Sequence, residues 1–178
     1  MGRLLLGVGN LLMGDDGVGV HVARALKPEE AELGVTVEDG GTGGLALLEY
    51  FDAYDEILVV DAAGFGGQPG EVAPIRPELL TARRAWSAHD HGIVEVLRFM
   101  QFYPAAGAVR ILGVQPARVR PGTELSAELK AAWPHILEAV RREAAATWKS
   151  AVPAHRPTGM SDAQAGASTW KKEVEQYG

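Results

Sequence analysis

Three residues far apart in the sequence, Asp16, Asp61 and His89, carry side chains that can bind a metal ion. Asp16 follows a continuous apolar run at residues 4–8, and Asp61 ends a second one at residues 57–60. If both runs are parallel strands, the loops that leave their carboxyl ends share one edge of the sheet, where ligands bind. Two carboxylate oxygens and one imidazole nitrogen then form an open ligand set for a divalent first-row metal, with a position left for water or substrate. This pattern does not determine which metal binds.

Each of these residues also has a plainer interpretation. Asp16, taken alone, is as readily a helix cap as a ligand. Asp61 is harder to explain this way, because a carboxylate at the end of a wholly apolar strand needs a partner or a ligand. His89 alone is most often a structural or surface histidine, and His91 competes with it for any role. The remaining histidines are interpreted as structural or solvated: His21, His135 and His155.

Other glycine-rich motifs give weaker signals. Residues 7–12 begin like a dinucleotide-binding fingerprint, but Leu12 replaces the third glycine and carboxylates stand where a pyrophosphate would bind. Residues 39–44, Asp-Gly-Gly-Thr-Gly-Gly, lack the lysine of a phosphate-binding loop, and no Gly-x-Ser-x-Gly elbow is present. The glycines of residues 39–44 either let a peptide backbone approach closely or only shape a turn. Nucleotide binding is disfavoured.

Composition narrows the function classes further. The chain has 178 residues, of which 47% are hydrophobic and 22% charged, as expected for one globular domain. A net charge of -6 disfavours nucleic acid and anionic lipid as partners. Cysteine is absent, which excludes disulfides, thiolate ligands and a cysteine nucleophile. No run of about 20 apolar residues occurs, so no membrane association is expected and we predict a cytoplasmic protein.

The order of elements predicts an α/β fold: a single domain with a mostly parallel twisted sheet, flanked by helices on both faces. The domain is expected to span residues 1–149, followed by a low-complexity, flexible tail at residues 150–178. Asp15 or Asp16 is expected to cap the first helix, and Pro134 to kink or break the last. Strands are expected at 4–8, 35–38, 57–60, 109–114 and, as an edge strand between prolines, 72–75; helices are expected from 15 or 16 to 28, over 45–51, over 93–100 and over 125–149.

Five motifs, taken in order, resemble the maturation endopeptidases of nickel-iron hydrogenases over roughly residues 3–145. Each motif is modest alone, but the five in this order and spacing are specific. They are Gly-Val-Gly-Asn-Leu-Leu-Met-Gly-Asp-Asp-Gly at 7–17, Asp-Gly-Gly-Thr at 39–42, Val-Val-Asp at 59–61, Ser-x-His-x-x-Gly at 87–92 and Gly-Val-Gln-Pro at 113–116.

The resemblance implies that Asp16, Asp61 and His89 are the metal-binding and catalytic residues, the first position being Glu or Asp across the family. It implies a protease that removes a short C-terminal extension from a hydrogenase large-subunit precursor already carrying nickel. Nickel would thus arrive within the precursor, and zinc or cadmium would occupy the same site in vitro. The family's Asp-Gly-Gly-Thr motif implies a role in substrate binding for Asp39, Gly40, Gly41 and Thr42. Which carboxylate acts as the general base stays open.

Two other functions remain alternatives. The same three residues would suit a non-catalytic module that binds or senses nickel during maturation. A doubly wound nucleotide-binding domain is the third candidate, which a dinucleotide titration tests.

Overall fold

Strands and helices alternate along the chain, as the apolar runs predict. The computed structural model describes residues 2–43, 47–75 and 108–146. The elements are β1 (Arg3–Gly7), the 3-10 turn η1 (Asp15–Gly17), α1 (Val18–Leu26), the 3-10 turn η2 (Lys27–Glu29), α2 (Glu30–Leu33), β2 (Thr36–Asp39), α3 (Leu48–Ala53), β3 (Glu56–Ala62), β4 (Val72–Pro74), β5 (Ala108–Val114) and α6 (Ala127–Ala145).

The strands form one sheet in the order β2-β1-β3-β5-β4. The first four are parallel, and β4 pairs with β5 in the antiparallel sense. β4 ends on Pro74, which is compatible with its place at the sheet edge because proline cannot donate a ladder hydrogen bond. The mostly parallel α/β fold predicted from the sequence is confirmed.

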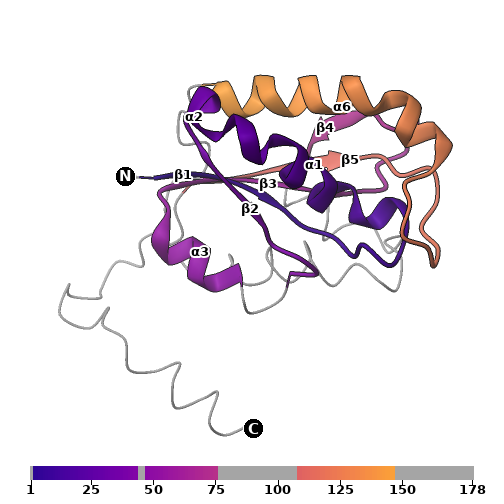
Figure 1. Ribbon diagram of the computed structural model, residues 1–178, viewed down its shortest axis with the longest axis horizontal. Helices are drawn as coiled ribbons and strands as arrows, with labels where there is room; N and C mark the ends of the chain where they lie inside the picture. Colours follow the sequence, from indigo (N-terminus) through magenta and orange to yellow (C-terminus); the bar gives the residue numbers. More distant parts are fainter. Residues whose placement is uncertain (1, 44–46, 76–107, 147–178) are drawn as a thin grey trace, which may run out of the picture.

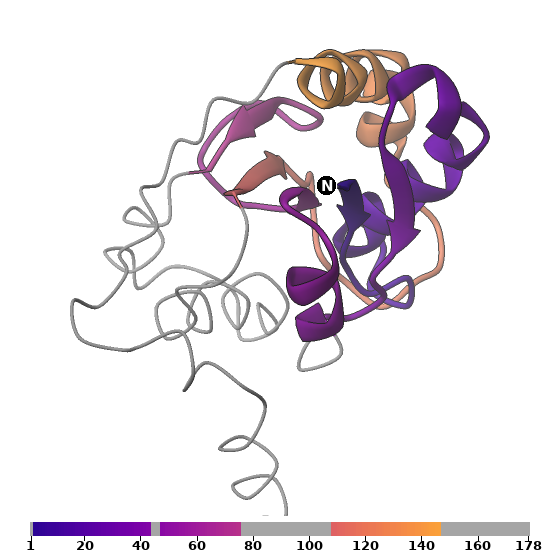
Figure 2. The same ribbon diagram turned by 90° about the vertical axis from the view of Figure 1, so that its left-hand side faces the viewer.

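Helices cover both faces of the sheet (Figures 1 and 2). α1 and α6 lie on one face, and α3 lies on the other. Successive residues of β1 point to opposite faces, so Leu5 joins the cluster under α1 and α6 while Leu4 and Leu6 join the cluster that includes Leu47. The run Leu4–Leu6 of β1 is therefore apolar without interruption, because both faces of the strand are buried there.

The expected cap of the first helix needs correction, and of the kink or break expected at Pro134 the break does not occur. Gly17 is the N-cap residue of α1, and no side chain caps that helix, so neither predicted aspartate does so. α6 is capped by Ser126, whose hydroxyl accepts a hydrogen bond of 3.2 Å from the Leu129 N–H. Pro134 does not break α6, which continues to Ala145 while its buried residues, among them Ile136 and Val140, pack on the sheet.

Some predicted elements lie outside the described residues. These are the helix at 93–100 and the tail at 150–178, so the domain boundary at 149 stays a prediction. In the part of the chain that is described, no helix has both the length and the apolar character needed to cross a membrane.

Candidate active site at the strand ends

Asp16 lies in the loop between β1 and α1, within the turn η1. Its side chain is half-buried, and Oδ2 accepts a hydrogen bond of 3.1 Å from the backbone N–H of Asn10. Gly9 lies so close to this turn that a Cβ atom on it would be 2.0 Å from the carbonyl oxygen of Asp16. Gly9 also has a φ of 142°, which side-chain-bearing residues rarely adopt. The glycine therefore allows the loop to fold back on the end of β1.

Asp61 is the penultimate residue of β3 and is only 7% exposed. Its Oδ1 accepts a hydrogen bond of 2.8 Å from the N–H of Ala62. Asp61 pairs in register with Gly113 of β5, one residue beyond Val60, which pairs with Gly7 of β1. This nearly buried carboxylate thus belongs to the carboxyl end of the central strands.

Asp16 and Asp61 come from the two strands that flank the switch point of the sheet. From β1 the chain crosses to β2 on one side and then returns to β3 on the other, so the connections diverge between β1 and β3. The turn η1 that carries Asp16 contacts β3 directly. In open parallel sheets, ligands bind outside the carboxyl ends of the strands at such a point.

The predicted substrate-binding residues lie beside this edge, at the end of β2. The N–H of Gly40 donates to the carbonyl of Gly7, and the carbonyl of Gly41 accepts from the N–H of Gly9, each at 2.8 Å. Asp39 Oδ1 accepts a hydrogen bond of 2.9 Å from the Gly41 N–H. These bonds fix the 39–41 turn against the end of β1.

The other oxygen of Asp39 forms an ion pair with Arg24 of α1, at 2.9 Å. Thr42 is exposed. The two glycines of this motif thus shape a tied turn, one of the two roles left open for them. A role for Asp39 and Thr42 in binding substrate stays a prediction.

His89 and its competitor His91 lie outside the described residues. Among the residues that are described, no group of three histidine, aspartate or glutamate side chains is arranged to hold a metal. The three-ligand set therefore stays a prediction that requires a residue from 76–107.

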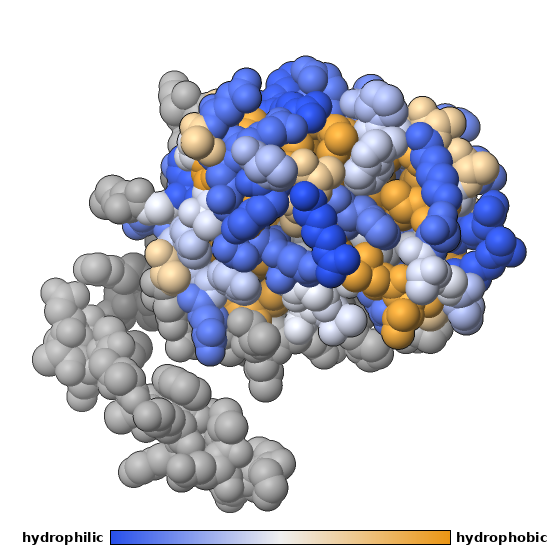
Figure 3. Space-filling view, viewed as in Figure 1, coloured by the Kyte–Doolittle hydropathy of each residue, from blue (hydrophilic) through white to orange (hydrophobic). Residues whose placement is uncertain are grey.

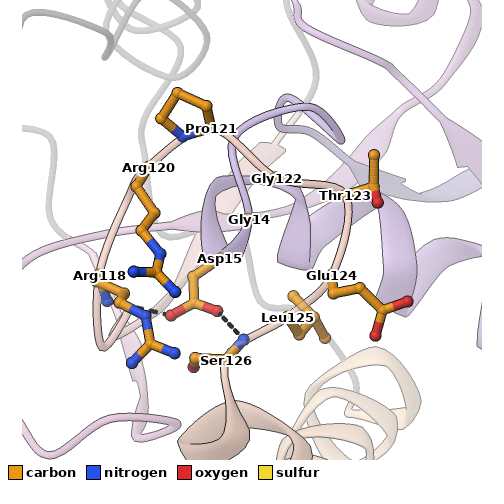
Figure 4. A pocket seen from close by; sticks show the side chains of 10 residues that line it. All are labelled: Gly14, Asp15, Arg118, Arg120, Pro121, Gly122, Thr123, Glu124, Leu125 and Ser126. Atoms are coloured by element: carbon orange, nitrogen blue, oxygen red, sulfur yellow. Dashed lines mark hydrogen bonds between the residues drawn. The ribbon is translucent and has the colours of Figure 1, made fainter.

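The sequence predicts Asp15 only as a possible helix cap, but the structure gives it a different role. It is 1% exposed and accepts three backbone hydrogen bonds from the segment after β5. Figure 4 shows those from Arg118 and Ser126. No local pattern signals this, because every donor lies more than a hundred residues away along the chain.

Gln115, at the end of β5, is a second residue whose role the sequence did not indicate. Its Oε1 accepts hydrogen bonds from the N–H groups of Phe65, Gly66 and Gly67, at 2.9, 3.0 and 3.2 Å. Gln115 thereby holds the loop that leaves β3 just after Asp61. Its place in the 113–116 motif was the only available signal.

The right-hand end of the molecule in Figure 1 contains the strand ends and their loops. Leu12, in the loop after β1, is 67% exposed. Among the described residues it is the large hydrophobic side chain that stands open to solvent. In Figure 3, hydrophobic side chains lie among polar ones at this end of the molecule. This end of the molecule thus presents both apolar and polar surface.

The fold is that of a doubly wound α/β protein, in which Asp16 and Asp61 lie at the switch point of the sheet. Comparison with known proteins is more specific, because the model of the hydrogenase maturation protease family matches residues 20–143. This chain belongs to that family.

Its relatives agree with this assignment. The chain is 34% identical over 166 residues to the hydrogenase expression/formation protein HupD of Rhizobium leguminosarum bv. viciae, covering 89% of this chain and 80% of that protein. It is 36% identical over 124 residues to HupM of Azotobacter chroococcum, covering 65% of this chain but only 58% of that protein. The solved structure of the hydrogenase maturating endopeptidase HybD from E. coli superposes with a TM-score of 0.63 at 30% identity, covering 79% of this chain and 90% of that one.

Proposed function

We propose that this protein is an endopeptidase that removes a C-terminal peptide from a hydrogenase large-subunit precursor after nickel has been inserted. The observation that carries the proposal is the placement of Asp16 and Asp61 at the strand ends on either side of the switch point. Family membership supplies the class of activity. Nickel, in this proposal, belongs to the substrate.

The donor chemistry is compatible with this role. Carboxylate oxygens from Asp16 and Asp61 and an imidazole nitrogen from His89 are ligands that divalent first-row metals accept. Three protein ligands leave coordination positions for groups of the precursor. Nickel-free precursor would lack this link to the enzyme, so the metal would set the specificity.

Peptide hydrolysis then needs an activated water. Asp16, Asp61 and His89 would hold the metal, which when bound would polarise the scissile carbonyl or lower the pKa of a water molecule. A carboxylate of the site accepts the proton of the attacking water, a C–O bond forms, and the C–N bond breaks as the leaving amine takes up a proton. The chain has no cysteine for a covalent route and no serine elbow.

Binding of the precursor would use the surface next to these residues. The turn at 39–41 offers Asp39, the exposed Thr42 follows it, and the loop after β1 offers the exposed side chain of Leu12. Together they provide polar and apolar contacts for an extended peptide beside the strand ends.

The test compares nickel-loaded and nickel-free precursor in a gel-shift assay. Asp16→Ala, Asp61→Ala and His89→Ala are each expected to abolish or strongly slow processing of the loaded form. His91→Ala and His135→Ala are the matched controls and should have far smaller effects.

Calorimetry provides a second measurement of the same site. The protein is expected to bind nickel, zinc or cadmium weakly, and Asp61→Asn or His89→Ala should reduce that affinity with little loss of stability. Equal cutting of both precursor forms would refute metal sensing, and full activity without Asp61 and His89 would refute the catalytic assignment. Metal binding without any cutting would favour the non-catalytic nickel-sensing module.

A further inference from the structure

Asp15 and Asp16 are adjacent in sequence but have different surroundings. Both oxygens of Asp15 accept backbone hydrogen bonds: Oδ1 from Ser126 at 2.6 Å, and Oδ2 from Ala117 at 3.0 Å and Arg118 at 3.1 Å. Asp15 is 1% exposed, whereas Asp16 is half-buried. The buried charge of Asp15 is therefore compensated by donors within the fold.

The three donors belong to one segment, residues 117–126, which leads from β5 to α6 (Figure 4). Ser126 is the N-cap residue of α6, a helix of 19 residues, so Asp15 also contacts the start of that helix. With its oxygens occupied in this way, Asp15 is not a competitor of Asp16 for a metal.

A second set of bonds joins the same two segments. The N–H of Gly14 donates to the carbonyl of Gly122 at 2.8 Å, and the N–H of Gly122 donates to the carbonyl of Leu12 at 2.9 Å. Bridges between Met13 and Gly122 and between Gly14 and Val119 continue this pairing. The loop that carries Asp16 is thus held both by its pairing with residues 119–122 and by the contact of η1 with β3.

We propose that Asp15 is a positioning residue for the site: it holds the loop so that the Asp16 carboxylate stays at the ends of β1 and β3. This inference rests on the proposed function for the role of Asp16. Binding groups act well only when neighbouring residues keep them in place before the ligand arrives. Asp15 supplies that support through its three hydrogen bonds to the segment at residues 117–126.

The test uses Asp15→Asn, which keeps the size of the side chain but replaces one acceptor oxygen with an NH2 group. The amide hydrogens of Ala117, Arg118 and Ser126 are expected to exchange faster with solvent. Zinc affinity, measured by calorimetry on the full chain, is expected to fall roughly tenfold, as for other residues that support metal ligands. On nickel-loaded precursor, kcat/KM should fall and KM should rise, because the nickel that links precursor and enzyme binds through Asp16 in the proposed function.

Ser126→Ala is the matched control. It removes the hydroxyl that caps Leu129 but keeps the Ser126 N–H that Asp15 accepts. It should therefore lower Tm without lowering zinc affinity or kcat/KM.

Gly122→Ala is the second variant, for the case in which Asp15→Asn does not fold. A Cβ atom at this position would meet nothing within 4 Å. The substitution would therefore only strain the backbone of Gly122, which has a φ of 155° and pairs with the loop that carries Asp15.

The outcomes separate this inference from the proposed function. If Asp15→Asn and Gly122→Ala both keep the wild-type zinc affinity, the positioning role is overturned. It is also overturned if their loss of zinc affinity is no larger than that of Ser126→Ala when the Tm values are equal. If the wild-type protein binds zinc but cuts no precursor, the proposed function fails while the zinc and exchange measurements still decide the role of Asp15. A wild-type protein that binds no zinc overturns both.

Discussion

Gly19 of α1 lies directly against Val60 of β3: a Cβ atom on Gly19 would be 2.1 Å from the Val60 carbonyl oxygen. The same atom would be 2.3 Å from the carbonyl oxygen of Val8, so the start of α1 rests on the ends of both central strands. This close approach places the turn of Asp16, just before α1, beside the strand that carries Asp61.

Gly19→Ala is expected to destabilise the protein by roughly 3 kcal/mol or more, because backbone atoms on two strands block the added methyl group. The free energy of unfolding in urea measures the effect. Gly64→Ala is the control: a Cβ there meets nothing within 4 Å, and the change should stay within about 0.5 kcal/mol. Similar stabilities for the two variants would contradict the close contact.

Gln115→Ala is expected to cost about 1–3 kcal/mol, because it removes the acceptor shared by three backbone N–H groups of the loop after Asp61. Hydrogen exchange of the Phe65, Gly66 and Gly67 amides should accelerate in the folded protein. Gln68→Ala, at an exposed position in the same loop, serves as the control. Unchanged exchange at these amides would show that Gln115 does not hold the loop.

His21 should make stability depend on pH. Burial, with a smaller effect of Arg24, lowers the pKa of His21 below its usual 6.5, against the opposing effects of Glu124 and Asp39. Its Nε2 is buried and has no hydrogen-bond partner among the described residues. Because the unfolded chain takes up the proton at higher pH than the folded one, the stability contribution is complete above pH 6.5 and is lost as pH falls through the folded-state pKa.

The free energy of unfolding of His21→Leu is therefore expected to fall less than that of the wild type when the pH is lowered from about 7.5 to about 5, that is, through the usual histidine pKa of about 6.5. Chemical denaturation at both values measures this difference. Equal losses in the two proteins would mean that His21 titrates alike in the folded and unfolded states.

Deleting residues 150–178 should leave Tm within about 2 °C of the full chain, which corresponds to less than about 1 kcal/mol for a domain of this size. The reason is that Arg3 Nη2 already ties the end of α6 to β1, through the carbonyls of Ala144 and Ala146 at 2.7 and 2.9 Å. A deletion from residue 140 is the control and should unfold the protein, since it removes the buried Val140 and Ala144. A drop of many degrees on the shorter deletion would mean that the tail packs on the core.

The sequence by itself determined the sheet and the family. Apolar runs buried on both faces marked β1 and β3, and proline beside residues 72–75 marked the edge strand, because both signals are local. The position of Asp61 near a strand end followed from the same local pattern. The family followed from five motifs in order, and its model match confirms it. The roles of Asp16, Asp61 and His89 are still predictions.

Only the tertiary structure decided which of two adjacent aspartates is buried. Asp15 and Asp16 are the same residue type, and the sequence predicts either of them as the cap of α1. Gly17 takes that position instead. Asp15 turns inward because its N–H partners at Ala117, Arg118 and Ser126 reach it across the sheet edge, more than a hundred residues along the chain. Local sequence patterns cannot encode such a contact, since it exists only after β5 has paired with β3 and brought the next segment alongside η1.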